Sequence, residues 1–148
     1  MDQNTQSMQA QSVLTQNVVE QIKSVLVKKL EPSFIILFGS QATGATHSES
    51  DVDLAFYKPE CDMSVYDVFS LASELASLVK ADVDLINLSE ASTVFKAQIF
   101  ATGKPLYIAN QFEFDKYQMN VMSMYANLNV ERREILKSII ERGRIYDN

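Results

Sequence analysis

Residues 34–53 constrain this chain most, because an apolar strand runs into a small polar turn and then into two aspartates. The run 34–38 reads Phe-Ile-Ile-Leu-Phe, which is typical of a strand covered on both faces. Gly39-Ser40 follows at once, and the spacer 41–50 leads to Asp51 and Asp53. Because strand side chains alternate between faces, these two carboxylates are expected to project from the same face.

The chemistry of these side chains predicts a metal site beside a phosphate site. Two neighbouring carboxylates repel each other when ionised, and a cation between them relieves that cost. Mg²⁺ takes oxygen ligands and usually arrives with substrate phosphates. Gly39 lets the backbone approach a ligand closely, and Ser40 offers a hydroxyl and an N–H to an anion.

The rest of the pattern predicts an α/β fold, a small mixed sheet with helices packed on one face and the carboxylates on the other, open face. We expect residues 1–11 to be a disordered tail and 12–148 to form one domain. Helices are expected from about Ser12 to Pro32 and from Ser64 to about Lys80. Further elements are a strand over 51–57, a strand over 82–88, a helix capped by Ser89 and closed by a left-handed Gly103, an edge strand over 104–108 and a long helix within 112–142.

Composition narrows the class of protein. The net charge of −6 argues against broad nucleic-acid binding. Cys61 is the only cysteine, which excludes an intramolecular disulfide and favours a reducing compartment. No apolar run reaches membrane length, and no secretory signal is visible. We therefore expect a cytoplasmic protein without membrane contact.

The order Gly-Ser, spacer, Asp-x-Asp resembles the signature of the DNA polymerase beta-like nucleotidyltransferase superfamily. That superfamily uses a third carboxylate on a later strand. Asp84 in the segment Ala81–Leu88 is the better match for it, and Asp82 is the alternative. The chain's size and the segment 103–107 are similar to the minimal nucleotidyltransferase (MNT) antitoxins, the partners of HEPN-domain toxins.

This resemblance implies an activity, a cofactor and a partner. Asp51, Asp53 and Asp84 would be the catalytic carboxylates and would bind two Mg²⁺ ions, while Gly39 and Ser40 would bind the nucleotide. ATP would be the donor, and the acceptor would be a tyrosine of a cognate HEPN ribonuclease toxin. Transfer of AMP to that tyrosine would silence the toxin.

Several alternatives stay open at this point. The enzyme would otherwise modify a small hydroxylated molecule such as an aminoglycoside, or the chain would be an antitoxin that acts by binding alone. His47 and Lys104 are either nucleotide contacts or ordinary surface residues. The methionine- and arginine-bearing C-terminal helix is either a solvated face or a docking surface for the toxin.

Overall fold

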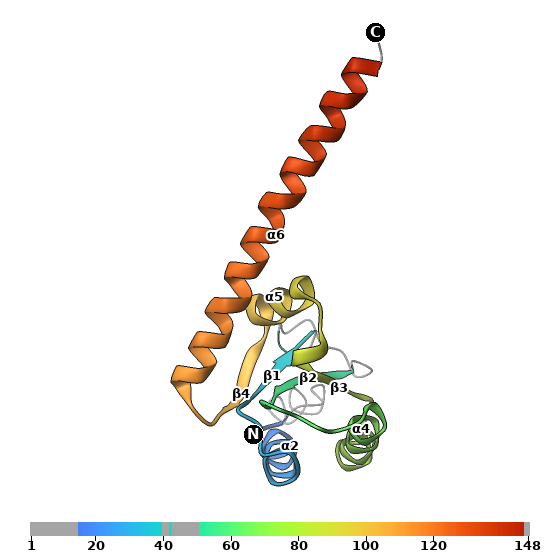
Figure 1. Cartoon of the computed structure of the whole chain (residues 1–148). Coiled ribbons are helices and arrows are strands. Elements are labelled where there is room, and N and C mark those ends of the chain that lie inside the picture. The colour runs from blue at the N-terminus through green and yellow to red at the C-terminus, as the bar shows by residue number, and fades with distance from the viewer. Residues whose placement is uncertain (1–14, 40–41, 43–50, 147–148) are drawn as a thin grey trace, which may run out of the picture.

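The computed structural model describes residues 15–39, 42 and 51–146. A four-stranded sheet in the order β3-β2-β1-β4 forms its centre (Figure 1). The strands are β1 (Phe34–Phe38), β2 (Val52–Tyr57), β3 (Val83–Asn87) and β4 (Lys104–Ile108). The β1 strand pairs antiparallel with β2 and β4, whereas β2 and β3 are parallel. The expected mixed sheet is therefore confirmed; the tail 1–11, Ser40 and His47 lie outside the described residues.

Local capping explains where the first helices begin and end. Helix α2 (Gln16–Leu30) starts after Thr15, whose hydroxyl accepts from the Val18 N–H, so the expected start near Ser12 was too early. It ends at Glu31, in the left-handed conformation. Helix α4 (Val65–Val79) has the expected capping box between Ser64 and Asp67.

The segment after β3 differs from the expectation. Ser89 lies in a short 3₁₀ turn, η1 (Leu88–Glu90), and Ser92 caps helix α5 (Thr93–Thr102) instead. Gly103 ends α5 in an extended conformation, with φ −82° and ψ 168°, and not in the left-handed one. A Cβ at this position would lie 2.5 Å from both Ile36 Cγ2 and the Ile99 carbonyl oxygen, so close packing against β1 is what requires glycine here.

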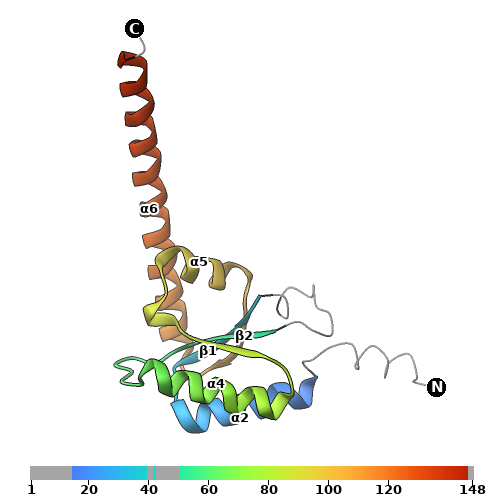
Figure 2. The same ribbon diagram turned by 90° about the vertical axis from the view of Figure 1, so that its right-hand side faces the viewer.

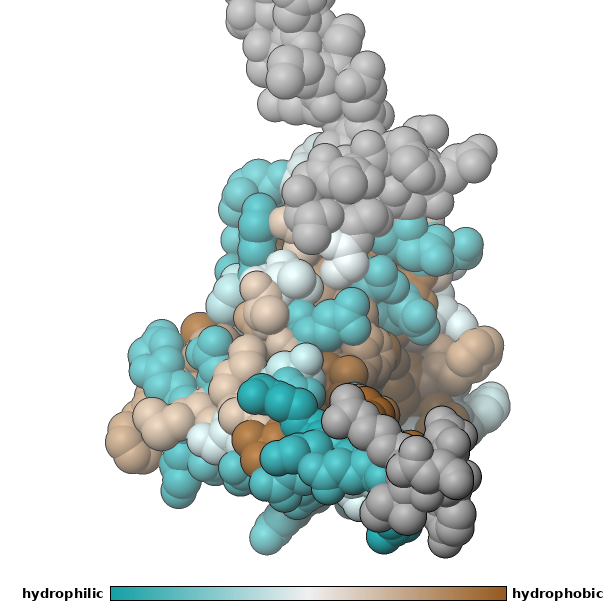
Figure 3. Space-filling view, turned by 90° about the horizontal axis from the view of Figure 1, so that it is seen from above, coloured by the Kyte–Doolittle hydropathy of each residue, from teal (hydrophilic) through white to brown (hydrophobic). Residues whose placement is uncertain are grey.

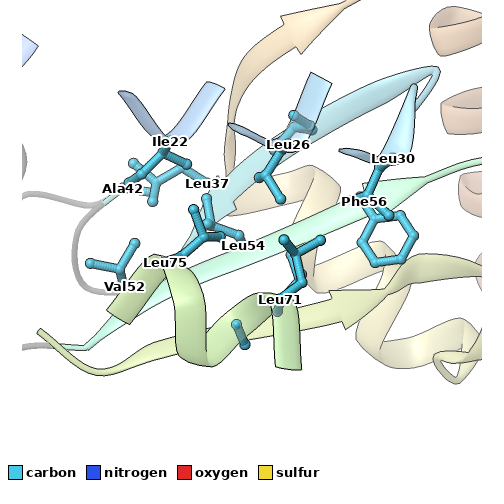
Figure 4. Packing of buried hydrophobic residues seen from close by; sticks show 13 residues of the cluster. Ile22, Leu26, Leu30, Leu37, Ala42, Val52, Leu54, Phe56, Leu71 and Leu75 are labelled. Carbon is cyan, nitrogen blue, oxygen red and sulfur yellow. The ribbon is translucent and has the colours of Figure 1, made fainter. Parts of the chain in front are cut away.

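Helices α2 and α4 cover one face of the sheet. The alternate β2 residues Val52, Leu54 and Phe56 are fully buried against them, as their period-2 spacing predicts. In Figure 4, Leu26 of α2 and Leu75 of α4 point into this cluster with the strand side chains. This core fixes the helix-facing side of β2 and leaves Asp53 on the other side.

The opposite face is also covered, but only over part of its area. A second buried cluster joins β1 and Ala55 of β2 to α5 and the first turns of helix α6 (Gln111–Tyr146). Phe34 is its hub, with ring centroids 6.0 Å from Phe100 and 4.9 Å from Phe114. Helices therefore pack on both faces, and the expectation of one covered face holds only near the carboxylates.

Helix α6 extends far beyond the rest of the molecule. Its first half lies beside α5, and its second half rises alone in both ribbon views (Figures 1 and 2). Val121 is its last buried residue among those described, and Tyr125 is the last that packs on the second cluster. The described helices include none long and apolar enough to cross a membrane.

Candidate active site

Four aspartates lie at the neighbouring ends of β2 and β3. In the parallel register Asp53 lies beside Asp84, so both side chains project from the same face. Asp51 and Asp82 each precede this paired stretch, and the Val52 N–H donates to the Asp82 carbonyl at 2.9 Å. Asp51, Asp82 and Asp84 are exposed, and Asp53 is half-buried.

Asp53 is the member of this group whose pKa is shifted. Burial raises the pKa of Asp53 above its ordinary value of 3.8, and the nearby charges of Asp84 and then Asp51 raise it further. Asp82 is not among these causes. The surroundings of Asp53 thus disfavour its ionised carboxylate, and a bound cation would stabilise that carboxylate. Because Asp84 raises the pKa of Asp53 and Asp82 does not, Asp84 is favoured over Asp82 as the third member of the group.

Gly39 closes the site on the β1 side. Phe38, the last residue of β1, pairs with Asp53, so the turn at Gly39 lies directly beside that carboxylate. Gly39 has φ +74°, a conformation that glycine adopts at little cost. A Cβ on Gly39 would collide with Oδ2 of Asp53. The expected closeness of turn and carboxylates is therefore seen for Gly39, while Ser40 lies outside the described residues.

The donor set suits a hard divalent cation, although the site is not a closed cage. Within residues 15–39, 42 and 51–146, no three acidic, histidine or cysteine side chains are grouped closely enough to hold a metal by themselves. Mg²⁺ commonly uses one or two carboxylates and takes its other ligands from phosphates and water. Asp51 and Asp53 fit that mode of binding, because Asp51 directly precedes β2, two residues before Asp53, and its charge contributes to the raised pKa of Asp53.

A groove of about 610 Å³ lies along the outer edge of β3, on the side of the carboxylates away from Gly39. Helix α4 supplies its apolar wall through Val65, Phe69 and Ala72, among others, and Asp51, Asp84 and Glu90 contribute to its acidic rim. Asp53 does not line it. Sequence reasoning missed this groove, although α4 carries several exposed apolar side chains, among them Val65, Tyr66 and Phe69.

Lys104 stands apart from the carboxylates. It begins β4, where it pairs with Leu37, and β1 separates it from β2. Its side chain is exposed.

Comparisons with known proteins show the family of this chain. The family described as "Polymerase beta, Nucleotidyltransferase" matches residues 20–112. The protein adenylyltransferase MntA of Shewanella oneidensis is 32% identical over 127 residues, which cover 86% of this chain and 88% of the relative.

Solved structures show the same fold at similar identity. A chain from a crystal structure described as a toxin-antitoxin with AMP-PNP superposes with a TM-score of 0.73 at 32% identity, covering 82% of this chain and 98% of that one. A chain from a complex described as tri-AMPylated Shewanella oneidensis HEPN toxin with MNT antitoxin gives a TM-score of 0.71 at 29% identity, covering 86% and 99%.

Proposed function

The chain belongs to the polymerase beta-type nucleotidyltransferase family, and we propose that it is an antitoxin that transfers AMP from ATP to a tyrosine of a cognate HEPN toxin. Relatives named protein adenylyltransferase and neighbours from toxin-antitoxin complexes support this activity and this partner. Modification of the toxin neutralises it.

The observation that carries the proposal is the position of Asp53. It lies between Gly39 of the β1 turn and Asp84 of β3, and its own pKa is raised by burial and by the other carboxylates. The Gly39 turn lies close to Asp53 on one side, and Asp84 lies beside it on the other. A nucleotide and an acceptor would therefore have separate places on the two sides of Asp53. We therefore assign the nucleotide to the Gly39–Ser40 side and the acceptor to the Asp84 side.

The carboxylates divide two tasks between them in this proposal. Asp51 and Asp53 would hold Mg²⁺, and Asp84 would be available to a second ion. Bound Mg²⁺ would neutralise charge on the triphosphate and lower the pKa of the acceptor hydroxyl. The acceptor oxygen forms a bond to the α-phosphorus of ATP while the bond to the bridging β-phosphate oxygen breaks. Pyrophosphate leaves, and Asp84 accepts the hydroxyl proton.

The groove beside β3 supports an approach of the acceptor from that side. It borders Asp51 and Asp84, and its lining contains acidic side chains but no lysine or arginine among the described residues. Positively charged groups around an acceptor tyrosine would be attracted to this surface.

Isotopic labelling tests the reaction class. The protein is incubated with Mg²⁺, the purified toxin and ATP labelled at either the α- or the γ-phosphate. We expect the toxin to gain label from the α-phosphate only, and EDTA to prevent the transfer. Label that arrives from the γ-phosphate would show a kinase reaction and would refute the proposal.

A further inference from the structure

One face of α6 packs on the core at its start and continues unpartnered beyond it. Its members recur every three or four residues, the spacing of one helix face. The packed part comprises Phe114, Tyr117, Val121 and Tyr125. The same spacing then reaches Leu128, Arg132, Ile135 and Ile139, with Leu136 and Ile140 alongside. We call Leu128, Ile135, Leu136, Ile139 and Ile140 the distal stripe.

Four of the five side chains of the distal stripe are exposed, and Leu128 is half-buried. Ile135 is 58% exposed and Leu136 is 60% exposed, and Ile139 and Ile140 are similar. Seen from the C-terminal end of α6, hydrophobic side chains lie open among hydrophilic ones (Figure 3). In proteins a helix is stabilised mostly by packing of its apolar face, and this part of α6 packs against nothing in the described residues. Contiguous exposed apolar surface of this kind is typical of protein–protein contacts.

A small cavity lies at the base of the distal stripe. It has a volume of about 280 Å³ and is formed between α5 and α6. Val94, Ala97, Gln98 and Ala101 line it from α5, and Met122 and Tyr125 line it from α6. Because Tyr125 precedes Leu128 by less than one helical turn, the cavity and the stripe form one continuous surface. Binding energy at protein interfaces is concentrated where anchors fill such pockets.

We propose that this cavity and the distal stripe form the surface on which the toxin docks. The inference rests on the proposed function, which supplies the partner. The toxin would contribute an apolar helical face, an anchor side chain for the cavity and an acidic side chain opposite Arg132. Arg132 is the one charged side chain along the centre of the stripe, between Leu128 and Ile135.

Charge favours the toxin over a second copy of this chain. Two distal stripes packed face to face would bring two Arg132 side chains into the same dry interface, and burying like charges without partners is costly. A partner carboxylate would instead pair with Arg132. Docking here leaves the carboxylates of β2 and β3 uncovered, because α6 lies beyond α5 and β4 (Figure 1).

The test compares the same type of substitution on two sides of α6. Ile135→Asp lies within the distal stripe, whereas Val130→Asp lies on the opposite side of the helix, and Val130 is 49% exposed. Binding of each full-length variant to the purified toxin is measured by surface plasmon resonance. We expect Ile135→Asp to weaken binding by roughly tenfold or more and Val130→Asp to leave it within about twofold. Equal effects of the two substitutions would overturn the proposal.

Three further measurements separate this proposal from its alternatives. Ala101→Trp fills the cavity from α5 without altering α6, and we expect it to weaken toxin binding as well; unchanged binding would remove the cavity from the surface. Sedimentation of the wild-type chain alone should show a monomer, and a dimer that Ile135→Asp dissociates would assign the stripe to self-association. Labelling from α-labelled ATP at saturating toxin should persist in Ile135→Asp. A wild-type protein that neither binds nor labels the toxin would instead refute the proposed function.

Discussion

Replacing Gly39 by alanine should destabilise the protein and disable the site by one mechanism. The φ of +74° costs a residue with a Cβ about 1–2 kcal/mol. The new Cβ would also collide with Oδ2 of Asp53 and lie 3.2 Å from its Cγ. Turning the carboxylate group alone does not relieve the second contact, so the Asp53 side chain must leave its rotamer, at a further cost of about 0.5–1.5 kcal/mol. The displaced carboxylate is the proposed Mg²⁺ ligand.

Urea denaturation and transfer of α-labelled AMP to the toxin measure the two effects. Gly143→Ala is the matched control, because Gly143 lies in α6 with no atom within 4 Å of an added Cβ. This control should lose no stability and keep full activity, because Gly143 lies in the unpacked second half of α6 and alanine is the better helix former. In an Asp53→Ala background there is no carboxylate to displace, so Gly39→Ala should cost only about 1–2 kcal/mol, which comes from its positive φ. A Gly39→Ala protein with wild-type stability and transfer would refute the reasoning.

Three further predictions test other parts of the structure. Burial, and then the charges of Asp84 and Asp51, raise the pKa of Asp53, so ionisation of Asp53 costs more in the folded protein than in the unfolded one. Asp53→Asn removes this cost. In metal-free thermal unfolding the variant should therefore be as stable as wild type below pH 3.8, where Asp53 is protonated in both states, and more stable than wild type as the pH rises above 3.8. Asp84→Asn should slow transfer of labelled AMP much more than Asp82→Asn, and equal losses would reassign the third carboxylate. Phe34→Ala should lower the free energy of unfolding by about 3–5 kcal/mol in urea, because Phe34 is fully buried among four rings.

Sequence periodicity was sufficient for the strands and for the group of carboxylates. The apolar residues at every second position of β2 all face the core under α2 and α4, so Asp53, which lies between two of them, faces the other side of the sheet. The repeated Asp-Val-Asp pattern then placed Asp84 on the next strand. Which strands are neighbours, and that Asp53 and Asp84 share a register position, depends on the pairing of whole strands and was not fixed by local sequence.

Sequence periodicity was less informative where several residues offered the same local structure. Both Ser89 and Ser92 can cap a helix, and the 3₁₀ turn capped by Asn87 decides between them. Covering of the second sheet face depends on contacts between Phe34 and α6, which are distant along the chain. The groove along β3 was missed because it forms between α4 and β3, and how these two elements pack together is not visible in the local sequence of either.

The central claim is that the carboxylates around Asp53 transfer AMP to a tyrosine of the toxin. Intact-mass analysis of the toxin after incubation with Mg-ATP and this protein tests it most directly, with peptide mapping of the modified residue. We expect the toxin's mass to rise by one or more AMP units on tyrosine with the wild-type protein, and to stay unchanged with Asp53→Asn, which still binds the toxin. An unmodified toxin in a stable complex with wild-type protein and Mg-ATP, or equal modification by Asp53→Asn, would contradict the claim.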